Sequence, residues 1–315
     1  MKRVLITGAS GFIGSRLAIR AAQAGHDVIA TARHNSSALE AALGRTVQVL
    51  DVLAAGTAMR SFEADAIFHC ATANDVLSRD FTAGLDLSVN GTRNVLEMAV
   101  KNGIRNVIFF STLQVYGAEL EGIITEATQP RCESPYGLNH LLGEEVCRYY
   151  ANKHGLNTAL IRAANVYGVP DARSVERSTL VPMCFVKTAL QGRGIVLQSS
   201  GKQRRNFVST DEIADVCLHL LEDFPQGAQI INAGSNWLAS IHEIAQMVAA
   251  THRHRTDDHV GIEIRSSQPE CENQFRLESR LALLRPPVED SRTRMSEVIS
   301  RLFDHFGGDN FQMPD

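Results

Sequence analysis

Residues 4–14 read VLITGASGFIG, and this stretch decides the fold class of the chain. Its apolar start predicts a buried strand over residues 3–7, and apolar residues then recur with helical spacing over residues 12–24. Gly8, Gly11 and Gly14 occupy the turn, where glycine allows a positive φ and a close approach of backbone to phosphate. Free N–H groups at the start of the helix favour an anion. We therefore predict a dinucleotide site. An ordinary glycine turn is the alternative, because GxxGxxG is one residue longer than GxGxxG.

Strand and helix patterns alternate beyond this stretch. Further strands are predicted over 28–32, 47–50, 66–70, 106–111 and 158–162, and helices over 90–101 and 136–153. Such alternation indicates a Rossmann-type α/β fold, a doubly wound parallel sheet with helices on both faces. After about residue 166 the segments become shorter, with strands over 205–208 and 229–232, helices over 241–250 and 295–306, a loop over 252–259 and a loose tail over 307–315. We expect residues 1–165 with about 205–235 to form the dinucleotide-binding domain. About 166–204 with 236–315 would form a smaller C-terminal α/β substrate-binding domain.

Composition narrows the class of protein. With 315 residues, 44% of them hydrophobic and 21% charged, the chain has enough apolar residues for a sizeable core. A net charge of −4 weakens the case for a nucleic-acid or membrane-surface partner, and no apolar run reaches the ~18 residues of a membrane span. The six cysteines form no CxxC pair, so we expect a reduced, cytoplasmic enzyme without a zinc site. Likewise, no metal site is predicted at His252, His254 and His259.

The second predicted strand bears on the choice of cofactor. An acidic residue at its end would bind the ribose 2′-hydroxyl of NAD and repel the 2′-phosphate of NADP. Here Ala32 takes that place and Arg33 follows. Because a guanidinium suits a phosphate, NADP is favoured and NAD is the alternative.

Two hydroxyl-bearing residues are candidates for the chemistry. Thr112 follows the strand over 106–111, and Tyr136 lies 24 residues further on, at the start of a helix. A tyrosine phenol is an acid/base suited to a sugar hydroxyl or ketone if its pKa falls from ~10 towards the working pH. Thr112 would hydrogen-bond the same oxygen. For either residue alone, capping or packing is the simpler interpretation.

These residues belong to a longer ordered pattern. The sequence resembles the extended short-chain dehydrogenase/reductase family, in its NAD-dependent epimerase/dehydratase branch, whose members act on nucleotide sugars. The resemblance covers nearly the whole chain. It rests on TGASGFIGSRL (7–17), Asp51-Val52, HCATA (69–73), VNGTRN (89–94), FFSTLQVYG (109–117), SPYG (134–137), RAANVYG (162–168), QRRNFV (203–208), INAGS (231–235) and LLRPP (283–287).

The resemblance implies a role for each matching position. The pyrophosphate would be held by Gly8, Gly11, Phe12 and Ile13, with Gly14 in the same turn. Asp51 and Val52 would contact the adenine, and Cys70, Ala71 and Thr72 would line the cofactor cleft. Thr112 and Tyr136 would be the catalytic hydroxyls, and Asn165 and Arg205 would contact the substrate's diphosphate. A homodimer through the helices over 90–101 and 136–153 is also implied.

One position departs from the family pattern. The YxxxK motif reads Tyr136-Gly-Leu-Asn-His140. The usual lysine holds the nicotinamide ribose and lowers the pKa of the tyrosine. A histidine of pKa ~6.5 is mostly neutral at pH 7, although it can still hydrogen-bond a ribose hydroxyl. Three interpretations stay open: an active enzyme with His140 in the catalytic and cofactor-binding set, a slow enzyme that uses another acid, or a non-catalytic binding protein.

The leading hypothesis for function is hydride transfer at a carbon of a nucleotide-activated sugar. Reduction of a 4-ketosugar with NADPH is slightly favoured, and 4-epimerisation with a bound cofactor is the alternative. A dehydratase is less expected, because Leu113-Gln114 replaces the family's Asp-Glu pair. Further alternatives are a reductase of a non-sugar carbonyl and, because of His140, an NADP-binding regulatory protein.

Overall fold

A parallel sheet of seven strands is the central element of the computed structural model, which describes residues 1–171, 175, 177, 179–265, 274–280 and 290–307. Its order is β11-β7-β5-β4-β1-β2-β3, and every neighbouring pair is parallel. The strands are β1 (Arg3–Thr7), β2 (Asp27–Ala32), β3 (Gln48–Val49), β4 (Ala66–His69), β5 (Asn106–Thr112), β7 (Asn157–Ala163) and β11 (Ala228–Ala233). From β1 the chain adds β2 and β3 on one side of the sheet, and then returns to add β4, β5, β7 and β11 on the other side, as in a doubly wound sheet. The predicted Rossmann-type fold is confirmed.

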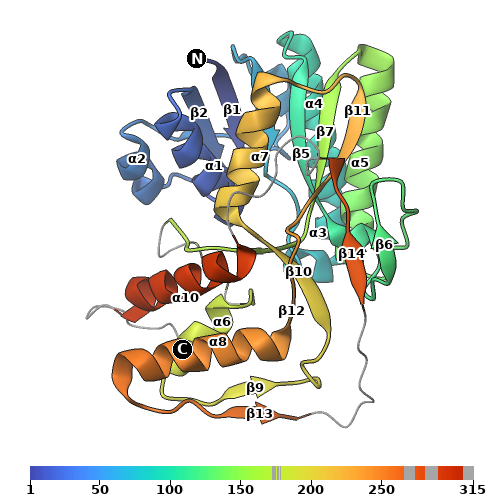
Figure 1. Ribbon diagram of the computed structural model, residues 1–315. Coiled ribbons are helices and arrows are strands. Elements are labelled where there is room, and N and C mark those ends of the chain that lie inside the picture. Colours follow the sequence, from blue (N-terminus) through green and yellow to red (C-terminus); the bar gives the residue numbers. More distant parts are fainter. Residues whose placement is uncertain (172–174, 176, 178, 266–273, 281–289, 308–315) are drawn as a thin grey trace.

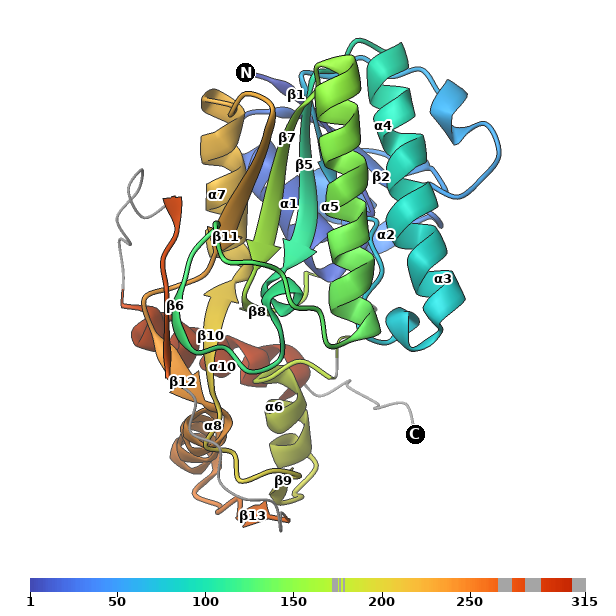
Figure 2. The same ribbon diagram turned by 90° about the vertical axis from the view of Figure 1, so that its right-hand side faces the viewer.

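Helices cover both faces of this sheet (Figure 1). On one face lie α1 (Phe12–Gln23) and α7 (Thr210–Glu222), with α2 (Ser37–Leu43) beside α1. On the other face α4 (Thr92–Lys101) and α5 (Pro135–His154) run side by side, as Figure 2 shows. Each face buries its own apolar cluster, which explains why strands such as β5 are apolar on both sides.

Shorter elements form the smaller part of the molecule, below the large sheet in Figure 1. A three-stranded sheet contains β8 (Asn165–Tyr167), β10 (Arg204–Ser209) and β12 (Leu238–Ser240), and β9 (Ile195–Leu197) pairs with β13 (Ile262–Ile264). Helices α6 (Met183–Leu190), α8 (Ile241–Thr256) and α10 (Ser291–Gly307) surround a separate apolar core. The boundaries given above for two domains stay a prediction. Between the two parts, β10 leads directly into α7.

Other short elements join these layers. They are η1 (Thr57–Met59), η2 (Leu77–Arg79), α3 (Phe81–Leu85), the π-helical η3 (Asp86–Gly91), η4 (Leu113–Tyr116), and the parallel pair of β6 (Gly122–Ile124) and β14 (Phe275–Leu277). The helix predicted from residue 90 therefore begins, as an α-helix, at Thr92. No helix in the described part of the chain is long and apolar enough to cross a membrane.

One predicted loop is wrong. Residues 252–256 continue α8, which ends only where Asp257 adopts a φ of 56°. A capping box of Ser240 and Glu243 starts this helix, and Arg253, His254 and Arg255 lie in its last turn, where cations favour the helix dipole. The polar composition therefore marked an exposed helical end. Cys271, the LLRPP motif and the tail after residue 307 lie outside the described residues.

Candidate active site

The glycine turn has the close packing that a phosphate-binding turn needs. Gly8 has a φ of 66°, and a Cβ there would lie 2.8 Å from the amide nitrogen of Ala71. A Cβ on Gly14 would collide with the carbonyl oxygen of Gly8. Gly11 precedes α1 without a side-chain cap, so the first N–H groups of that helix receive no side-chain partner from it. The structure thus brings together the predicted residues Gly8, Gly11, Phe12, Ile13 and Gly14 at the start of α1.

The other predicted cofactor residues follow neighbouring strands. Cys70, Ala71 and Thr72 follow β4 beside the glycine turn, and the amide of Cys70 donates to Thr7 O at 3.1 Å. Burial raises the pKa of the Cys70 thiol, so the thiol stays protonated and unreactive. Beyond β3, Val52 O accepts a hydrogen bond from Asn94 Nδ2 at 2.8 Å, and the Asp51 carboxylate accepts one from the amide of Leu53.

Arg33 lies apart from these contacts. It follows β2 and is exposed. It forms no ion pair within the described part of the chain. An exposed guanidinium at the end of β2 is available for a ligand, but the structure does not position it.

Thr112 and Tyr136 meet as the sequence predicts. Thr112 ends β5 and is 6% exposed, while Tyr136 starts α5, whose N-cap Ser134 accepts from the amide of Gly137 at 3.1 Å. Burial raises the pKa of Tyr136, and the side-chain hydrogen bond with Thr112 lowers it. The two hydroxyl groups thus lie together at the edge where β1, β4 and β5 end.

His140 is held differently from the predicted ribose contact. Its Nδ1 is 3.0 Å from Phe110 O and its Nε2 is 3.0 Å from Ala73 O, with 2% of the residue exposed. Its ring packs against that of Tyr136 at 4.6 Å. Burial lowers the pKa of His140 to about 4, although both carbonyls and Glu144 act to raise it. Both nitrogens face backbone carbonyls, so His140 ties the loop after β4 to β5 and neither nitrogen is open to a ribose hydroxyl. The neutral ring carries one N–H and donates to only one of the two carbonyls.

Arg205 and Asn165 lie on adjacent strands of the three-stranded sheet. Asn165 in β8 is paired with Phe207 of β10, and its Nδ2 donates to Asn206 O at 2.9 Å. The guanidinium of Arg205 donates to Gln203 Oε1 at 3.3 Å and forms no ion pair with any carboxylate that the structure describes. Burial lowers the pKa of Arg205. A half-buried cation without an acidic partner is a suitable ligand for a phosphate group.

A buried ion pair near the hydroxyls of Thr112 and Tyr136 was not predicted from the sequence. Arg162 of β7 and Glu144 of α5 are 1% and 0% exposed, and two hydrogen bonds of 2.6 and 2.9 Å join them. Ser111 donates to the same carboxylate at 2.6 Å. Glu144 is one helical turn from His140 and two turns from Tyr136, and this spacing was the available signal.

Another ion pair beside Tyr136 was also missed. Arg177 Nη2 lies 2.9 Å from Asp75 Oδ1, although 102 positions separate the two residues. Predicting this pair needs the fold. By contrast, His69 is a buried residue whose ring nitrogens lie 2.7 Å from Thr7 Oγ1 and 3.2 Å from Thr92 Oγ1.

Known proteins with similar sequences and folds carry several activities. The chain is 30% identical over 276 residues to UDP-N-acetyl-alpha-D-glucosaminuronate decarboxylase of Bacillus cytotoxicus, with 83% of this chain and 84% of that protein covered. It is 29% identical over 269 residues to dTDP-4-dehydro-6-deoxy-D-allose reductase of a Streptomyces species, covering 79% and 81%. The crystal structure of UDP-glucuronic acid 4-epimerase from Bacillus cereus in complex with NAD has the same fold, with a TM-score of 0.79, 21% identity and 96% of each chain covered.

The family itself follows from a match over most of the chain. The sequence profile of the NAD dependent epimerase/dehydratase family matches residues 4–234. This range contains the glycine turn, Thr112, Tyr136, Asn165 and Arg205. With its parallel sheet and ordered motifs, the chain belongs to the NAD-dependent epimerase/dehydratase family of extended short-chain dehydrogenases/reductases.

Proposed function

We propose that this enzyme transfers hydride at a carbon of a nucleotide-activated sugar, with Tyr136 as acid/base. The observation that carries the proposal is the pairing of Thr112 with Tyr136 at the sheet edge that also holds the glycine turn. Relatives that match about four fifths of this chain are named as a decarboxylase and a reductase of nucleotide sugars.

The residues at the glycine turn fit a dinucleotide. A Cβ at Gly8 or Gly14 would collide with the protein's own backbone, so only glycine allows the turn to pack this closely at the start of α1, as a dinucleotide-binding turn requires. Gly11, Phe12 and Ile13 would offer N–H groups to it, and Cys70 to Thr72 would line the path to Thr112. When bound, the nicotinamide supplies or accepts the hydride.

Tyr136 would handle the proton that accompanies this hydride. On reduction of a ketone the phenol gives its proton to the carbonyl oxygen, and on oxidation of an alcohol the phenolate takes it back. Thr112, whose hydroxyl acts to lower the pKa of Tyr136, would hold the same oxygen in place. His140 would act through packing and not as a proton donor to substrate, because it is neutral and both nitrogens face backbone carbonyls.

Arg205 and Asn165 would receive the diphosphate of the substrate. Arg205 has no acidic partner in the described structure, and a diphosphate would supply the missing negative charge. An uncharged carbonyl substrate would not. A sugar nucleotide is therefore favoured over a non-sugar carbonyl compound.

Within this class we favour reduction of a 4-ketosugar, with 4-epimerisation as the alternative. The exposed Arg33 after β2 supports NADPH, whereas the structural neighbour from Bacillus cereus contains NAD. Stoichiometric nucleotide released by denaturing freshly purified protein would indicate a recycled cofactor and an epimerase. An empty protein that binds NADPH more tightly than NADH would support the reductase, and an empty protein that binds neither would refute the enzyme proposal.

A variant of Arg33 separates the two cofactors. Arg33→Gln should weaken NADPH binding and leave NADH binding unchanged, because only NADPH carries the 2′-phosphate. The matched control is Arg60→Gln, another exposed arginine that follows a short element elsewhere in the chain. Equal affinities of wild type and Arg33→Gln for NADPH would contradict the assignment of Arg33.

We also propose a homodimer through α4 and α5. These helices lie side by side on one face, and Tyr149 of α5 is 52% exposed there. Light scattering after size exclusion measures the mass directly. Tyr149→Glu should shift a dimer towards monomer, and a wild-type mass of 34.5 kDa would refute the proposal.

A further inference from the structure

The acid/base proposed above lacks a cation one helical turn further along α5. His140 stands where the family pattern has a lysine, and burial lowers its pKa to about 4. At neutral pH its ring carries no charge. Burial also raises the pKa of Tyr136, so a phenolate there needs a positive charge from another element.

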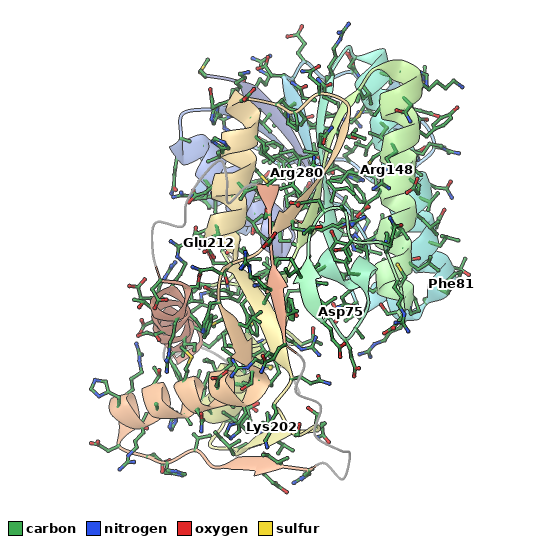
Figure 3. The ribbon with its side chains drawn as sticks, turned by 45° about the vertical axis from the view of Figure 1, so that its right-hand side comes forward. Asp75, Phe81, Arg148, Lys202, Glu212 and Arg280 are labelled. Carbon is green, nitrogen blue, oxygen red and sulfur yellow. The ribbon has the colours of Figure 1, made fainter. Side chains whose placement is uncertain are left out.

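The ion pair of Asp75 and Arg177, outside α5, can supply that charge. Asp75 is two residues after Ala73, whose carbonyl oxygen lies 3.0 Å from His140 Nε2. Its Oδ1 is 2.9 Å from Arg177 Nη2, and Thr179 donates to its Oδ2 at 3.4 Å. Contacts therefore run from the ring of Tyr136 through His140 to the loop that carries Asp75. Figure 3 shows Asp75 at the end of the larger part that faces the smaller part.

We infer that Arg177, held in place by Asp75, is the cation that stabilises the phenolate of Tyr136 in place of the lysine missing from α5. Arg177 is a positioning residue in this scheme, because it acts through Tyr136. The inference rests on the proposed function only where it concerns turnover, since the effect on the ionisation of Tyr136 exists without substrate.

The charges around Tyr136 agree with this assignment. Arg177 lowers the pKa of Tyr136, and Asp75 raises it by a smaller effect. Thr112 lowers it through a hydrogen bond, and His140 on the same helix is neutral. The Arg177 side chain is 23% exposed and the Asp75 side chain 38%, so the arginine is the better shielded from solvent of the two. Charges interact more strongly when solvent is excluded.

A direct titration of Tyr136 tests the inference. Protein labelled with [ζ-13C]tyrosine has five tyrosine signals, and Tyr136→Phe identifies the signal of Tyr136. In Arg177→Gln the pKa of Tyr136 should rise by about one unit, which is about tenfold less phenolate at a given pH. Asp75→Asn should lower this pKa, because its amide oxygen still accepts from Arg177 while the negative charge is gone. Arg177→Lys keeps the charge and should lie close to wild type.

The control is Arg20→Gln, which breaks a similarly half-buried pair with Asp215 at 2.6 Å on α1 and α7. It should leave the titration of Tyr136 unchanged. An unchanged pKa in folded Arg177→Gln, or a shift equal to that of Arg20→Gln, would overturn the inference. If Arg177→Gln does not fold, Asp75→Asn decides alone, and an unchanged or raised pKa there overturns it.

Turnover distinguishes this inference from the proposed function. If both hold, the pH profile of kcat/KM for a ketosugar shifts to higher pH in Arg177→Gln by the same amount as the titration. If Tyr136→Phe keeps full turnover while Arg177→Gln still shifts the titration, the acid/base proposal is refuted and the inference about Arg177 stands.

Discussion

At the scale of single residues, the site depends on which groups are charged. Tyr136 and His140 are in ring contact at 4.6 Å, yet burial pushes both towards their neutral forms. A neutral phenol suits proton donation to a ketone. The reverse reaction needs the phenolate and hence a compensating cation.

Tyr136→Phe removes the proposed acid/base with little change in packing. We expect kcat to fall by about 10²–10⁴-fold, the usual contribution of general acid/base catalysis. Dinucleotide affinity should stay near wild type. Tyr149→Phe, at an exposed phenol bonded to Lys153, is the matched control and should keep full kcat. Equal kcat in the two variants would rule out Tyr136 as the acid/base.

His140 should also make folding stability depend on pH. Its pKa is about 4 when folded, compared with ~6.5 in an unfolded chain, so the unfolded chain binds more protons between these values. Stability is then fully present above pH ~6.5 and falls by about 3 kcal/mol as the pH drops towards 4. Urea unfolding from pH 7.5 to 4.5 measures this slope, which His140→Gln should reduce. His69, whose pKa burial lowers to about 3, adds a similar slope and remains in the variant. A slope unchanged by His140→Gln would contradict the neutral imidazole.

At the scale of elements, the buried pair of Glu144 and Arg162 fixes α5 against β5 and β7. Arg162 also lies over the ring of Tyr116, with its guanidinium carbon 4.6 Å from the ring centroid. Because α5 carries Tyr136 and β5 carries Thr112, this pair sets the distance between the two hydroxyls.

Arg162→Met should destabilise the fold by about 3–5 kcal/mol, because the buried Glu144 carboxylate then keeps only Ser111 and the partly exposed Arg148 as partners. Urea unfolding at pH 7 measures the loss. The double variant Glu144→Leu/Arg162→Met should recover part of it, since neither charge then remains buried. Arg265→Met, which breaks an exposed pair with Glu263, should cost little, because solvent screens that pair. Equal losses in the two arginine variants would contradict this account.

The same scale explains what sequence reasoning found and missed. Buried parallel strands such as β5 and β7 are continuous apolar runs, and the glycine turn marks where the first helix begins. The sheet could therefore be predicted from the sequence. Short strands such as β9 and β13 have three residues each and carry too little pattern. The polar end of α8 was misread as a loop because its one buried residue, His252, is polar and the next four are exposed. Contacts such as Asp75 with Arg177 depend on the fold bringing distant segments together.

At the scale of the whole molecule, the two halves of the proposed site lie on different sheets. The glycine turn, Thr112 and Tyr136 belong to the seven-stranded sheet and its helices, whereas Arg205 and Asn165 belong to the three-stranded sheet. Dinucleotide and substrate diphosphate would therefore be bound by separate elements, and a substitution in one sheet should leave binding to the other unchanged.

Arg205→Met tests this separation. We expect the affinity for UDP and dTDP to fall by about 10–100-fold, since a charge-assisted hydrogen bond contributes about 1.5–3 kcal/mol, while NADH and NADPH bind as in wild type. Calorimetric titration with each nucleotide measures both. The neighbouring Arg204→Met is the matched control, because Arg204 already bonds to Leu238 O and lies 3.7 Å from Glu243. It should lose little affinity for UDP or dTDP. Loss of NADH or NADPH binding in Arg205→Met would mean that Arg205 serves the dinucleotide, and unchanged UDP and dTDP binding would mean that its unpaired charge serves neither nucleotide.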